Sequence, residues 1–344
     1  MATARISILV ATTFLSLLSG LLLPAKTALA DAQAVPRDWH TEWPRTDFSR
    51  SAIPYSEILS GGPAKDGIPA IDRPEFISIG AETGLAATEP VISVVIDGVA
   101  RAYPLRILIW HEIVNDRLAG VPIAVTYCPL CDAAIVFDRR LNDRLLDFGT
   151  TGKLRYSDLV MYDRQTESWW QQFLGRAIVG TLTGSELTIL PSRVEPVARF
   201  RDRHPDGKIL IPPDPQARAY GENPYAGYDG SRTPFLYQGS LPANIAPMAR
   251  VVAVGSTAWA LSLVKARGEI LTGDLRLRWH GGLNSALDTA DITHGRDIGY
   301  VTVERYHTET GWRDAAHDVT FAFAFHAFHP DGTLHGSGHT PPGQ

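Results

Sequence analysis

The chain has 344 residues with 32 basic and 37 acidic side chains, a net charge of −5 and only two cysteines. Its arginines are scattered and form no basic block, which argues against nucleic acid as a partner. Two cysteines cannot be the main support of so long a chain, so a hydrophobic core must stabilise the fold.

The first 30 residues have the pattern of an export signal. Arg5 gives a positive start, residues 6–24 are largely apolar, and Ala28-Leu29-Ala30 forms a cleavage pattern. We therefore expect a signal peptide over residues 1–30 and an exported protein, periplasmic or extracellular, with a retained N-terminal membrane anchor as the alternative. After cleavage we expect no membrane span, and export would place both cysteines in an oxidising compartment.

The mature chain is expected to divide into four parts. A Pro-, Gly-, Ser- and Trp-rich arm with Trp39 and Trp43 as anchors comes first, and a cysteine-turn domain follows it. A Pro/Gly-rich linker or surface loop then leads to a second unit. These parts occupy residues 31–67, 68–214, 215–247 and 248–344.

Two elements precede the cysteines. Residues 91–103 alternate in polarity around Asp97-Gly98, a dipeptide typical of a tight hairpin turn. Pro104 is expected to open a helix that runs to about residue 116, because apolar residues recur along one face of it.

Both cysteines lie on one tight turn, Cys128-Pro129-Leu130-Cys131, after a short apolar run that indicates a buried strand. Residues 133–138 indicate another strand, so the pair is predicted to cap a hairpin and not to open a helix as a thioredoxin-type site does. Two thiols at this spacing can bind a soft metal ion, cycle between dithiol and disulfide, or form an inert disulfide.

A metal site needs ligands beyond the two thiolates. His111 is the first candidate, because its helix leads directly into the cysteine strand. Met161 is the second if the ion is copper, since a thioether and a thiolate both suit Cu(I). The metal interpretation therefore names Cys128, Cys131, His111 and Met161.

A polar and aromatic stretch over residues 161–172 offers a different kind of site. Asp163, Arg164, Glu167 and Trp169 could form a polar ligand site beside the thiols, with the Trp face suited to a sugar or a cation. The alternative is a hairpin loop with an Asp–Arg ion pair and a packed Trp.

Beyond the linker the chain repeats short patterns. His-Pro-Asp-Gly occurs at 204–207 and again at 329–332, and two further short matches keep the same order. We expect a degenerate internal duplication whose second unit keeps the scaffold but lacks the helix and the cysteine hairpin. The fold class expected is α+β and β-rich, with mixed and antiparallel sheets.

Four motifs in combination resemble the exported microbial domain-of-unknown-function family numbered 3179. The core of the likeness is Thr-Tyr-Cys-Pro-Leu-Cys at residues 126–131, and the other three motifs are at 103–105, 111–116 and 161–164. The resemblance covers about residues 68–214 and becomes faint past Tyr225. The family has no established activity, so the resemblance implies no catalytic or binding residue.

We predict an exported protein that binds copper or zinc at the thiolate pair in a structural or carrier role. A thiol–disulfide oxidoreductase is the first alternative. A non-catalytic ligand-binding or interaction protein with an inert disulfide is the second, and its partner would be a small molecule or a protein. Whether the chain is an enzyme is left open.

Overall fold

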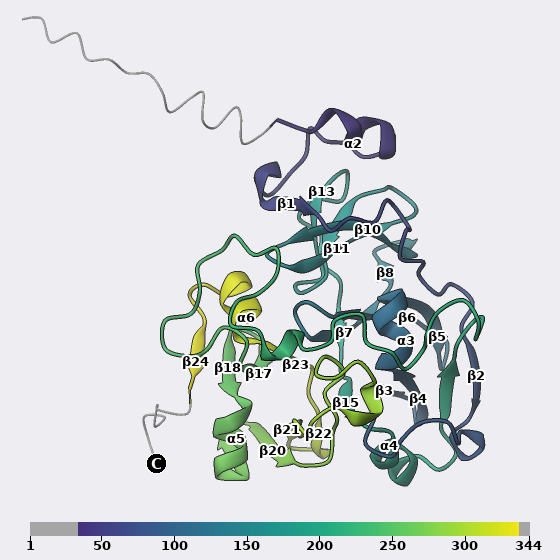
Figure 1. Ribbon diagram of the computed structural model, residues 1–344, viewed down its shortest axis with the longest axis vertical. Helices are drawn as coiled ribbons and strands as arrows, with labels where there is room; N and C mark the ends of the chain where they lie inside the picture. The colour runs from purple at the N-terminus through teal and green to yellow at the C-terminus, as the bar shows by residue number, and fades with distance from the viewer. Residues whose placement is uncertain (1–33, 337–344) are drawn as a thin grey trace, which may run out of the picture.

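The computed structural model describes residues 34–336, so the predicted signal peptide lies outside the described residues. The chain forms small antiparallel and mixed sheets with a few short helices, which confirms the β-rich prediction (Figure 1). Of the helices within residues 34–336, none is long and apolar enough to cross a membrane.

The first sheet of the first unit is built around a hairpin. The two strands of a strand–helix–strand connection lie one on each side of this hairpin. Strand β3 (Pro90–Ile96) pairs antiparallel with β4 (Val99–Pro104) around Asp97-Gly98, which confirms the predicted hairpin. Strands β15 (Arg193–Pro196) and β16 (Lys208–Ile211), joined by α4 (Val197–Arg203), lie beside β3 and β4 respectively. The outer edge is β2 (Glu75–Ser78), which pairs with β16.

The helix predicted over residues 104–116 is too long by five residues at its C-terminal end. Helix α3 (Leu105–His111) ends at Glu112, whose φ is 58° and whose N–H donates to the Leu108 carbonyl. Ile113 is β-branched and starts strand β5 (Ile113–Leu118), so the chain turns back into a sheet. The prediction failed because the apolar spacing after residue 112 fits a helix face as well as a buried strand.

The cysteines lie in a second sheet, next to α3. Strand β6 (Val121–Cys128) pairs antiparallel with β5 on one side and with β7 (Ala133–Asp138) on the other. The short strand β14 (Ile189–Leu190) completes the sheet beside β7. Nearly every residue of β6 and β7 is buried, as expected of strands that are covered on both faces.

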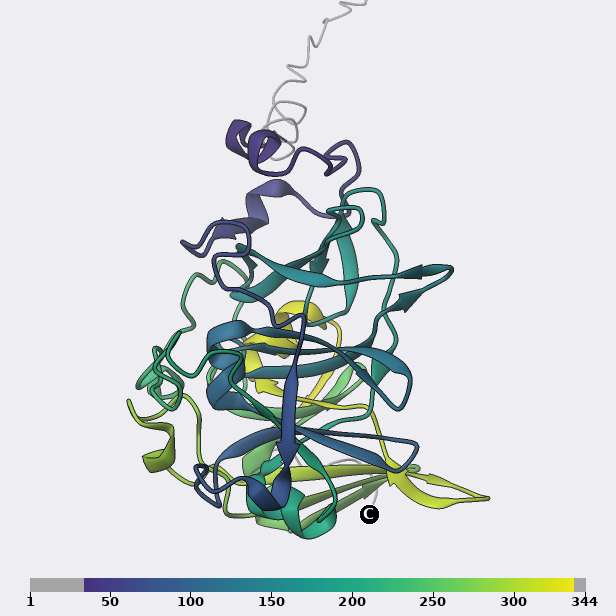
Figure 2. The same cartoon turned by 90° about the vertical axis from the view of Figure 1, so that its right-hand side faces the viewer.

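A third sheet lies in the chain between β7 and β14, after the small ribbon of β8 (Arg140–Leu141) and β9 (Arg144–Leu145). Figure 2 shows it at the end of the molecule next to α2. Its strands, in spatial order, are β1 (Ile58–Ser60), β10 (Phe148–Arg155), β11 (Asp158–Asp163), β12 (Trp169–Gln171) and β13 (Arg176–Val179).

The arm contributes more than strand β1 to this third sheet. Helix α2 (Arg37–Glu42) carries Trp39, and Trp43 follows the helix at once. Both indoles are buried, and their ring centroids lie 4.9 and 5.3 Å from that of Trp169 on β12. The arm is therefore part of the packed structure in this region.

The second unit repeats the order of elements of the first. Its hairpin of β17 (Arg250–Val254) and β18 (Thr257–Ala260) is flanked by β23 (Asp318–Phe321) and β24 (Thr333–His335), which α6 (Ala322–Phe328) joins. The two His-Pro-Asp-Gly turns follow α4 and α6. They lead into β16, which pairs in parallel with β4, and into β24, which pairs in parallel with β18. A four-stranded antiparallel sheet of β19 (Glu269–Thr272), β20 (Leu275–His280), β21 (Tyr300–His307) and β22 (Gly311–Asp314) takes the place of the cysteine-bearing sheet.

One expectation about the second unit is wrong. It has a helix, α5 (Leu261–Arg267), which follows β18 as α3 follows β4. What differs is the connection after the next two strands, where residues 281–299 stand in place of the cysteine turn 129–132. This long connection has no cysteine. Asp297 holds it in place by accepting hydrogen bonds from the N–H groups of Gly282 and Leu283.

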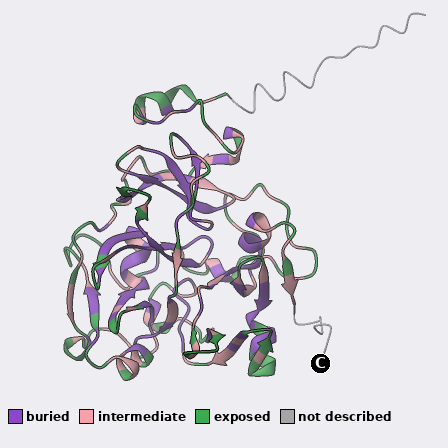
Figure 3. Cartoon of the chain, turned by 180° about the vertical axis from the view of Figure 1, so that it is seen from behind, coloured by how far each residue is buried: buried purple, intermediate pink, exposed green. Residues whose placement is uncertain are grey.

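One hydrophobic core spans the two units, beside smaller clusters within each of them. It contains Val125 and Phe137 of the cysteine sheet, Trp170 of the third sheet, and Leu287 and Phe323 of the second unit. Figure 3 shows that the strands meeting at the centre are buried, while hairpin tips and outer loops are exposed. The four 3₁₀ turns among the described residues are η1 (Tyr55–Glu57), η2 (Ile79–Ala81), η3 (Tyr228–Gly230) and η4 (Ile292–His294).

Residues 215–247, which we call the cover segment, have little regular structure and lie over the cysteine turn. The hydroxyl of Tyr228 donates to the carbonyl of Leu130, 3.0 Å away, and the carbonyl of Phe235 accepts a hydrogen bond from the Ser157 hydroxyl. The stretch expected as a linker or a surface loop therefore covers one side of the cysteine turn.

Candidate functional site

Three buried side chains bring their polar atoms together at the end of β6. Cys128 is the last residue of that strand, Cys131 lies in the turn, and Asp158 is the first residue of β11. The two sulfurs and a carboxylate oxygen lie within 4.8 Å of one another. Within residues 34–336 no other group of three His, Cys, Asp or Glu side chains meets this spacing for a metal ion.

The carboxylate of Asp158 has one oriented oxygen and one unpartnered oxygen. Oδ2 accepts hydrogen bonds from the Phe173 N–H at 2.9 Å and from Nε2 of Gln171 at 2.5 Å. Oδ1 is buried and has no hydrogen-bond partner. A buried acceptor without a donor is costly, so this oxygen can take a proton or bind a cation in a region where both thiols also interact with the carboxyl group.

Both cysteines are free thiols. Cys128 donates its S–H to the carbonyl of Ser157, with 3.6 Å between sulfur and oxygen. Burial raises the pKa of Cys128 and raises that of Cys131 well above its usual value. Without an added cation, the pair is therefore protonated at neutral pH.

The turn that carries Cys131 is held by the second unit. The carbonyl oxygen of Cys131 accepts hydrogen bonds from the hydroxyl of Thr320 at 2.7 Å and from the N–H of Phe321 at 3.0 Å. Both donors lie on β23, so the edge strand of one unit fixes the position of the thiol in the other.

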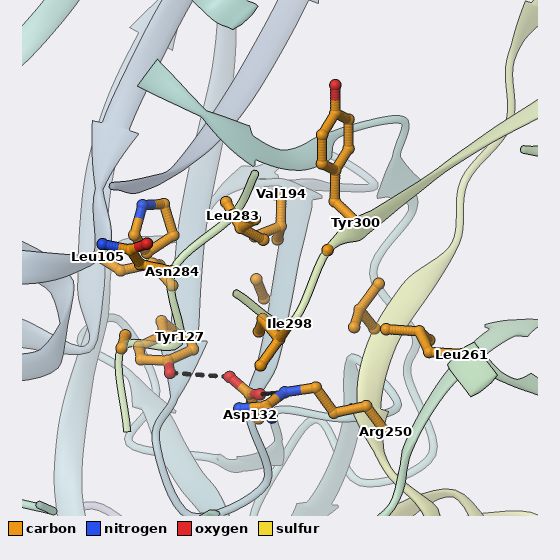
Figure 4. Close-up of a pocket in the computed structure, with 15 residues that line it drawn as sticks. Leu105, Tyr127, Asp132, Val194, Arg250, Leu261, Leu283, Asn284, Ile298 and Tyr300 are labelled. Atoms are coloured by element: carbon orange, nitrogen blue, oxygen red, sulfur yellow. Dashed lines mark hydrogen bonds and ion pairs between the residues drawn. The ribbon is translucent and has the colours of Figure 1, made fainter. Parts of the chain in front are cut away.

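The next residue, Asp132, is fixed by a buried ionic network (Figure 4). It accepts a hydrogen bond from the hydroxyl of Tyr127 at 3.0 Å, and its other oxygen lies 2.6 Å from Nε of Arg250. Arg250 also contacts Asp229 of the cover segment, which Arg296 pairs with in turn. The network therefore ties the cysteine turn to both the second unit and the cover segment.

A cavity of about 110 Å³ lies on the Cys128 side of the cluster. Its polar lining includes Glu112, Cys128 and Tyr225, whereas Cys131 does not line it. Much of the remaining wall is apolar, with Leu154 and Leu159 as examples. The two thiols therefore differ, because only Cys128 meets the cavity.

Three buried carboxyl groups in this region hold their protons unusually tightly. Burial, and then the nearby charge of Asp158, raises the pKa of Glu112 to about 8 and that of Asp318 to about 7. Burial likewise raises the pKa of Asp158 to about 6, against the hydrogen bonds that it accepts. Strongly shifted carboxyl groups beside a cavity are typical of functional sites.

The structure places His111 in a separate hydrogen-bonding environment. Its Nδ1 lies 2.7 Å from the Pro69 carbonyl oxygen, and its Nε2 lies 2.7 Å from the Tyr220 hydroxyl. Both ring nitrogens are thus occupied, and the histidine is outside the group formed by the thiols and Asp158. Met161 is buried in the main core three residues along β11 from Asp158, about 10 Å at the usual rise of a strand.

The four residues proposed as a polar ligand site form a turn that binds the arm. Glu167 pairs with Lys65 at 2.7 Å and with Arg45 at 3.1 Å, and the indole of Trp169 packs on the arm. Arg164 lies 3.2 Å from Asp72, while Asp163 accepts hydrogen bonds from Thr166 and from the indole of Trp170. Their polar groups are used to join segments of the protein.

Two residues at the site were not predicted from the sequence. Asp158 follows a turn of the third sheet and has no local motif, so only the folded chain brings it to the thiols. Glu112 belongs to the His-Glu-Ile-Val-Asn-Asp motif at 111–116, in which the predicted ligand was His111. The motif could have indicated Glu112, because a charged residue between two apolar runs is rarely buried unless it has a partner or a function.

The comparisons with known proteins agree with the motifs. A family described as "Protein of unknown function (DUF3179)" matches residues 65–332. The match includes most of the second unit, and so extends well beyond the 68–214 expected from the motifs. No curated protein and no solved structure matches the chain.

Proposed function

The chain belongs to this family of unknown function, DUF3179, as its motifs predicted, and we propose that it binds a divalent metal ion through Cys128, Cys131 and Asp158. The observation that carries the proposal is the unpartnered Oδ1 of Asp158 in a buried group with two thiols. Gln171 and the Phe173 N–H hold the other oxygen, as outer partners do at established metal sites.

Charge and ligand type favour zinc over copper. Two thiolates and one carboxylate carry three negative charges, of which a divalent ion neutralises two and Cu(I) only one. Uncompensated charge is costly in a buried site. A carboxylate oxygen also suits Zn²⁺ better than Cu(I), and the distance along β11 gives no support for Met161 as a thioether ligand.

Cys128, Cys131 and Asp158 would supply three ligands to the ion, and the cavity beside Cys128 would let a further molecule reach it. A site with three protein ligands and an open position is the arrangement found in catalytic zinc sites, whereas structural zinc sites are closed by four. We propose that the ion acts on, or is passed to, a molecule that enters the cavity. Residues 1–30 support export of the protein, and we propose that it works outside the cytoplasm.

Metal analysis tests the proposal directly. Purified protein is dialysed against Zn²⁺ and then buffer, and the ion content per chain is measured for Cys128→Ser, Cys131→Ser and Asp158→Asn. We expect about one ion in the unaltered protein and a loss in each variant. His111→Ala is the control and is expected to keep the ion, because His111 is bonded to Pro69 and Tyr220. Equal ion content in all four variants would refute the site.

A thiol–disulfide oxidoreductase is the second candidate, and the asymmetry of the pair favours it. Cys128 meets the cavity and could attack a small disulfide, and Cys131 could then release the product as the second thiol. The two cysteines would form a disulfide, and the small disulfide would leave as two thiols that carry the two electrons and the two protons. Asp158 would relay a proton between them. Metal-free protein that oxidises and reduces reversibly with glutathione disulfide and glutathione would favour this candidate.

The second unit is proposed to be a duplicated scaffold without a thiol site. The shared order of hairpin, helix, antiparallel sheet and flanking crossover supports a duplication. Its contacts to Cys131 and Asp132 support a structural contribution to the site of the first unit. If substitution of Thr320 and Arg250 leaves the ion content per chain unchanged, the second unit makes no such contribution.

A further inference from the structure

Glu112 has a backbone conformation that a residue with a side chain rarely adopts. It caps α3 with φ of 58°, and its carbonyl accepts a hydrogen bond from the Tyr127 N–H at 2.8 Å. In the second unit Gly268 caps α5 with φ of 71°, and its carbonyl accepts a hydrogen bond from the Trp279 N–H at 2.9 Å. The two positions are equivalent, and glycine is the residue that the geometry favours.

The side chain of Glu112 has no structural partner to explain its presence. The residue is 8% exposed and lines the cavity beside Cys128. No described residue donates a hydrogen bond to its carboxylate or pairs with it. A strained backbone that supports a buried and unpartnered acid therefore points to a ligand of that acid.

The groups around the cavity select for positive charge. Glu112 and Cys128 line it, with Asp158 and Cys131 behind, and all four are acids. Lys153 is the one basic residue in the lining, but its Nζ lies 2.8 Å from Glu42 and 5.5 Å from the ring centres of Trp39, Trp43 and Trp169. Above the pKa of Glu112, which is about 8, its carboxylate gives the cavity a negative charge that no described residue pairs with, even without a metal ion.

The polar groups of the lining match the donors of an ammonium group. The carboxylate of Glu112, the hydroxyl oxygen of Tyr225 and the sulfur of Cys128 are three acceptors, and a primary ammonium has three N–H donors. The apolar wall of Leu154 and Leu159 suits a short alkyl chain. Because a cavity of roughly 150 Å³ holds the six carbon atoms of benzene, one of about 110 Å³ suits roughly four to five non-hydrogen atoms.

We propose that this cavity binds a small primary amine as its cation, with the ammonium group paired to Glu112 and the alkyl chain against Leu154 and Leu159. The proposal goes beyond metal binding and does not depend on it, because the cavity is lined by Glu112 and Tyr225 whether or not the thiols hold an ion.

Three probes with the same branched alkyl group and different charge test the proposal: isobutylamine, isobutanol and sodium isobutyrate. The amine and the alcohol have equal size, so their comparison is the decisive one. The binding of each probe to the full chain is measured by titration calorimetry at pH 9 in the presence of EDTA, where Glu112, with a pKa of about 8, is ionised and a primary amine is still protonated. We expect the amine to bind at least about tenfold more tightly than the alcohol, and the carboxylate not to bind. Equal binding of amine and alcohol, or tighter binding of the carboxylate, would overturn the proposal.

Two substitutions at Glu112 separate a binding role from a structural one. Glu112→Gln should abolish the preference for the amine over the alcohol. Glu112→Gly should abolish it too, while the melting temperature stays the same or rises, because glycine relieves the left-handed backbone. A retained preference in either variant, or a lower melting temperature in Glu112→Gly, would overturn the assignment.

Cys131→Ser distinguishes this proposal from the metal proposal. Cys131 does not line the cavity, so this variant should lose the ion and keep the preference for the amine. Loss of the ion together with the preference for the amine would show that the cavity does not bind amines independently of the metal site.

Discussion

Arg250 provides the sharpest test of how the cysteine turn is held. Its side chain is 8% exposed and pairs with two carboxylates, Asp132 at 2.6 Å and Asp229 at 3.0 Å, which are 11% and 0% exposed. In Arg250→Ala, Asp229 keeps Arg296 and the Ser285 hydroxyl, but Asp132 keeps only the hydroxyl of Tyr127. The variant therefore leaves one buried charge without a cation.

Breaking a buried ion pair on one side costs about 3–5 kcal/mol. Because only one of the two carboxylates loses its cation, we expect a loss near the lower end, about 3 kcal/mol in the free energy of unfolding. Arg278→Ala is the matched control, since its pair with Glu269 is 43% and 39% exposed. Exposed pairs contribute about 0–1 kcal/mol, so the control should change little.

Urea unfolding, followed by tryptophan fluorescence, measures both variants, and an unchanged m value would show that the two states are comparable. The rate at which the thiols react with a disulfide reagent is the second measurement. Because Asp132 follows Cys131 directly, we expect faster modification in Arg250→Ala and no change in Arg278→Ala. An Arg250→Ala variant as stable as Arg278→Ala would refute the reasoning.

Two other predictions concern stability. Glu112 has a pKa raised from 4.5 to about 8, so the folded state binds its proton more tightly than the unfolded state does, and its contribution is complete below pH 4.5 and lost by about pH 8. Metal-free protein should therefore lose a few kcal/mol of unfolding free energy between these pH values, at about 1.4 kcal/mol per pKa unit, and Glu112→Gln should flatten the curve. An equal slope in both proteins would contradict this. Trp39→Ala should cost about 3–5 kcal/mol, because the indole is buried against Trp169, whereas the exposed Asp38→Ala should be neutral in the same urea assay. If the two variants are equally stable, the arm does not support the third sheet.

The sequence predicts local structure well where one residue type decides it. Asp97-Gly98 specifies the turn between β3 and β4, because both residues adopt positive φ there. The end of α3 was not predicted, because the apolar spacing after residue 112 fits a helix as well as a strand and Glu112 adopts a left-handed conformation that its residue type does not favour. Functional sites are where such local rules fail.

The candidate site could be predicted only in part for a similar reason. Cys128 and Cys131 are the only cysteines, so their rarity and spacing marked them. Asp158 approaches them only because β11 of the third sheet begins beside the end of β6. The contacts from Thr320 and Arg250 come from the second unit. Pairings between such distant segments leave no periodic pattern in the chain.

The hydrogen bond from Thr320 to the Cys131 carbonyl spans 189 residues, and this separation affects how the protein is made. A chain that is synthesised from its N-terminus presents both thiols to solvent long before the strand that covers their turn has been made. During that interval the sulfurs are open to oxidants and to any available cation. The state of the two sulfurs when the turn is covered therefore depends on how fast the rest of the chain is made and folds.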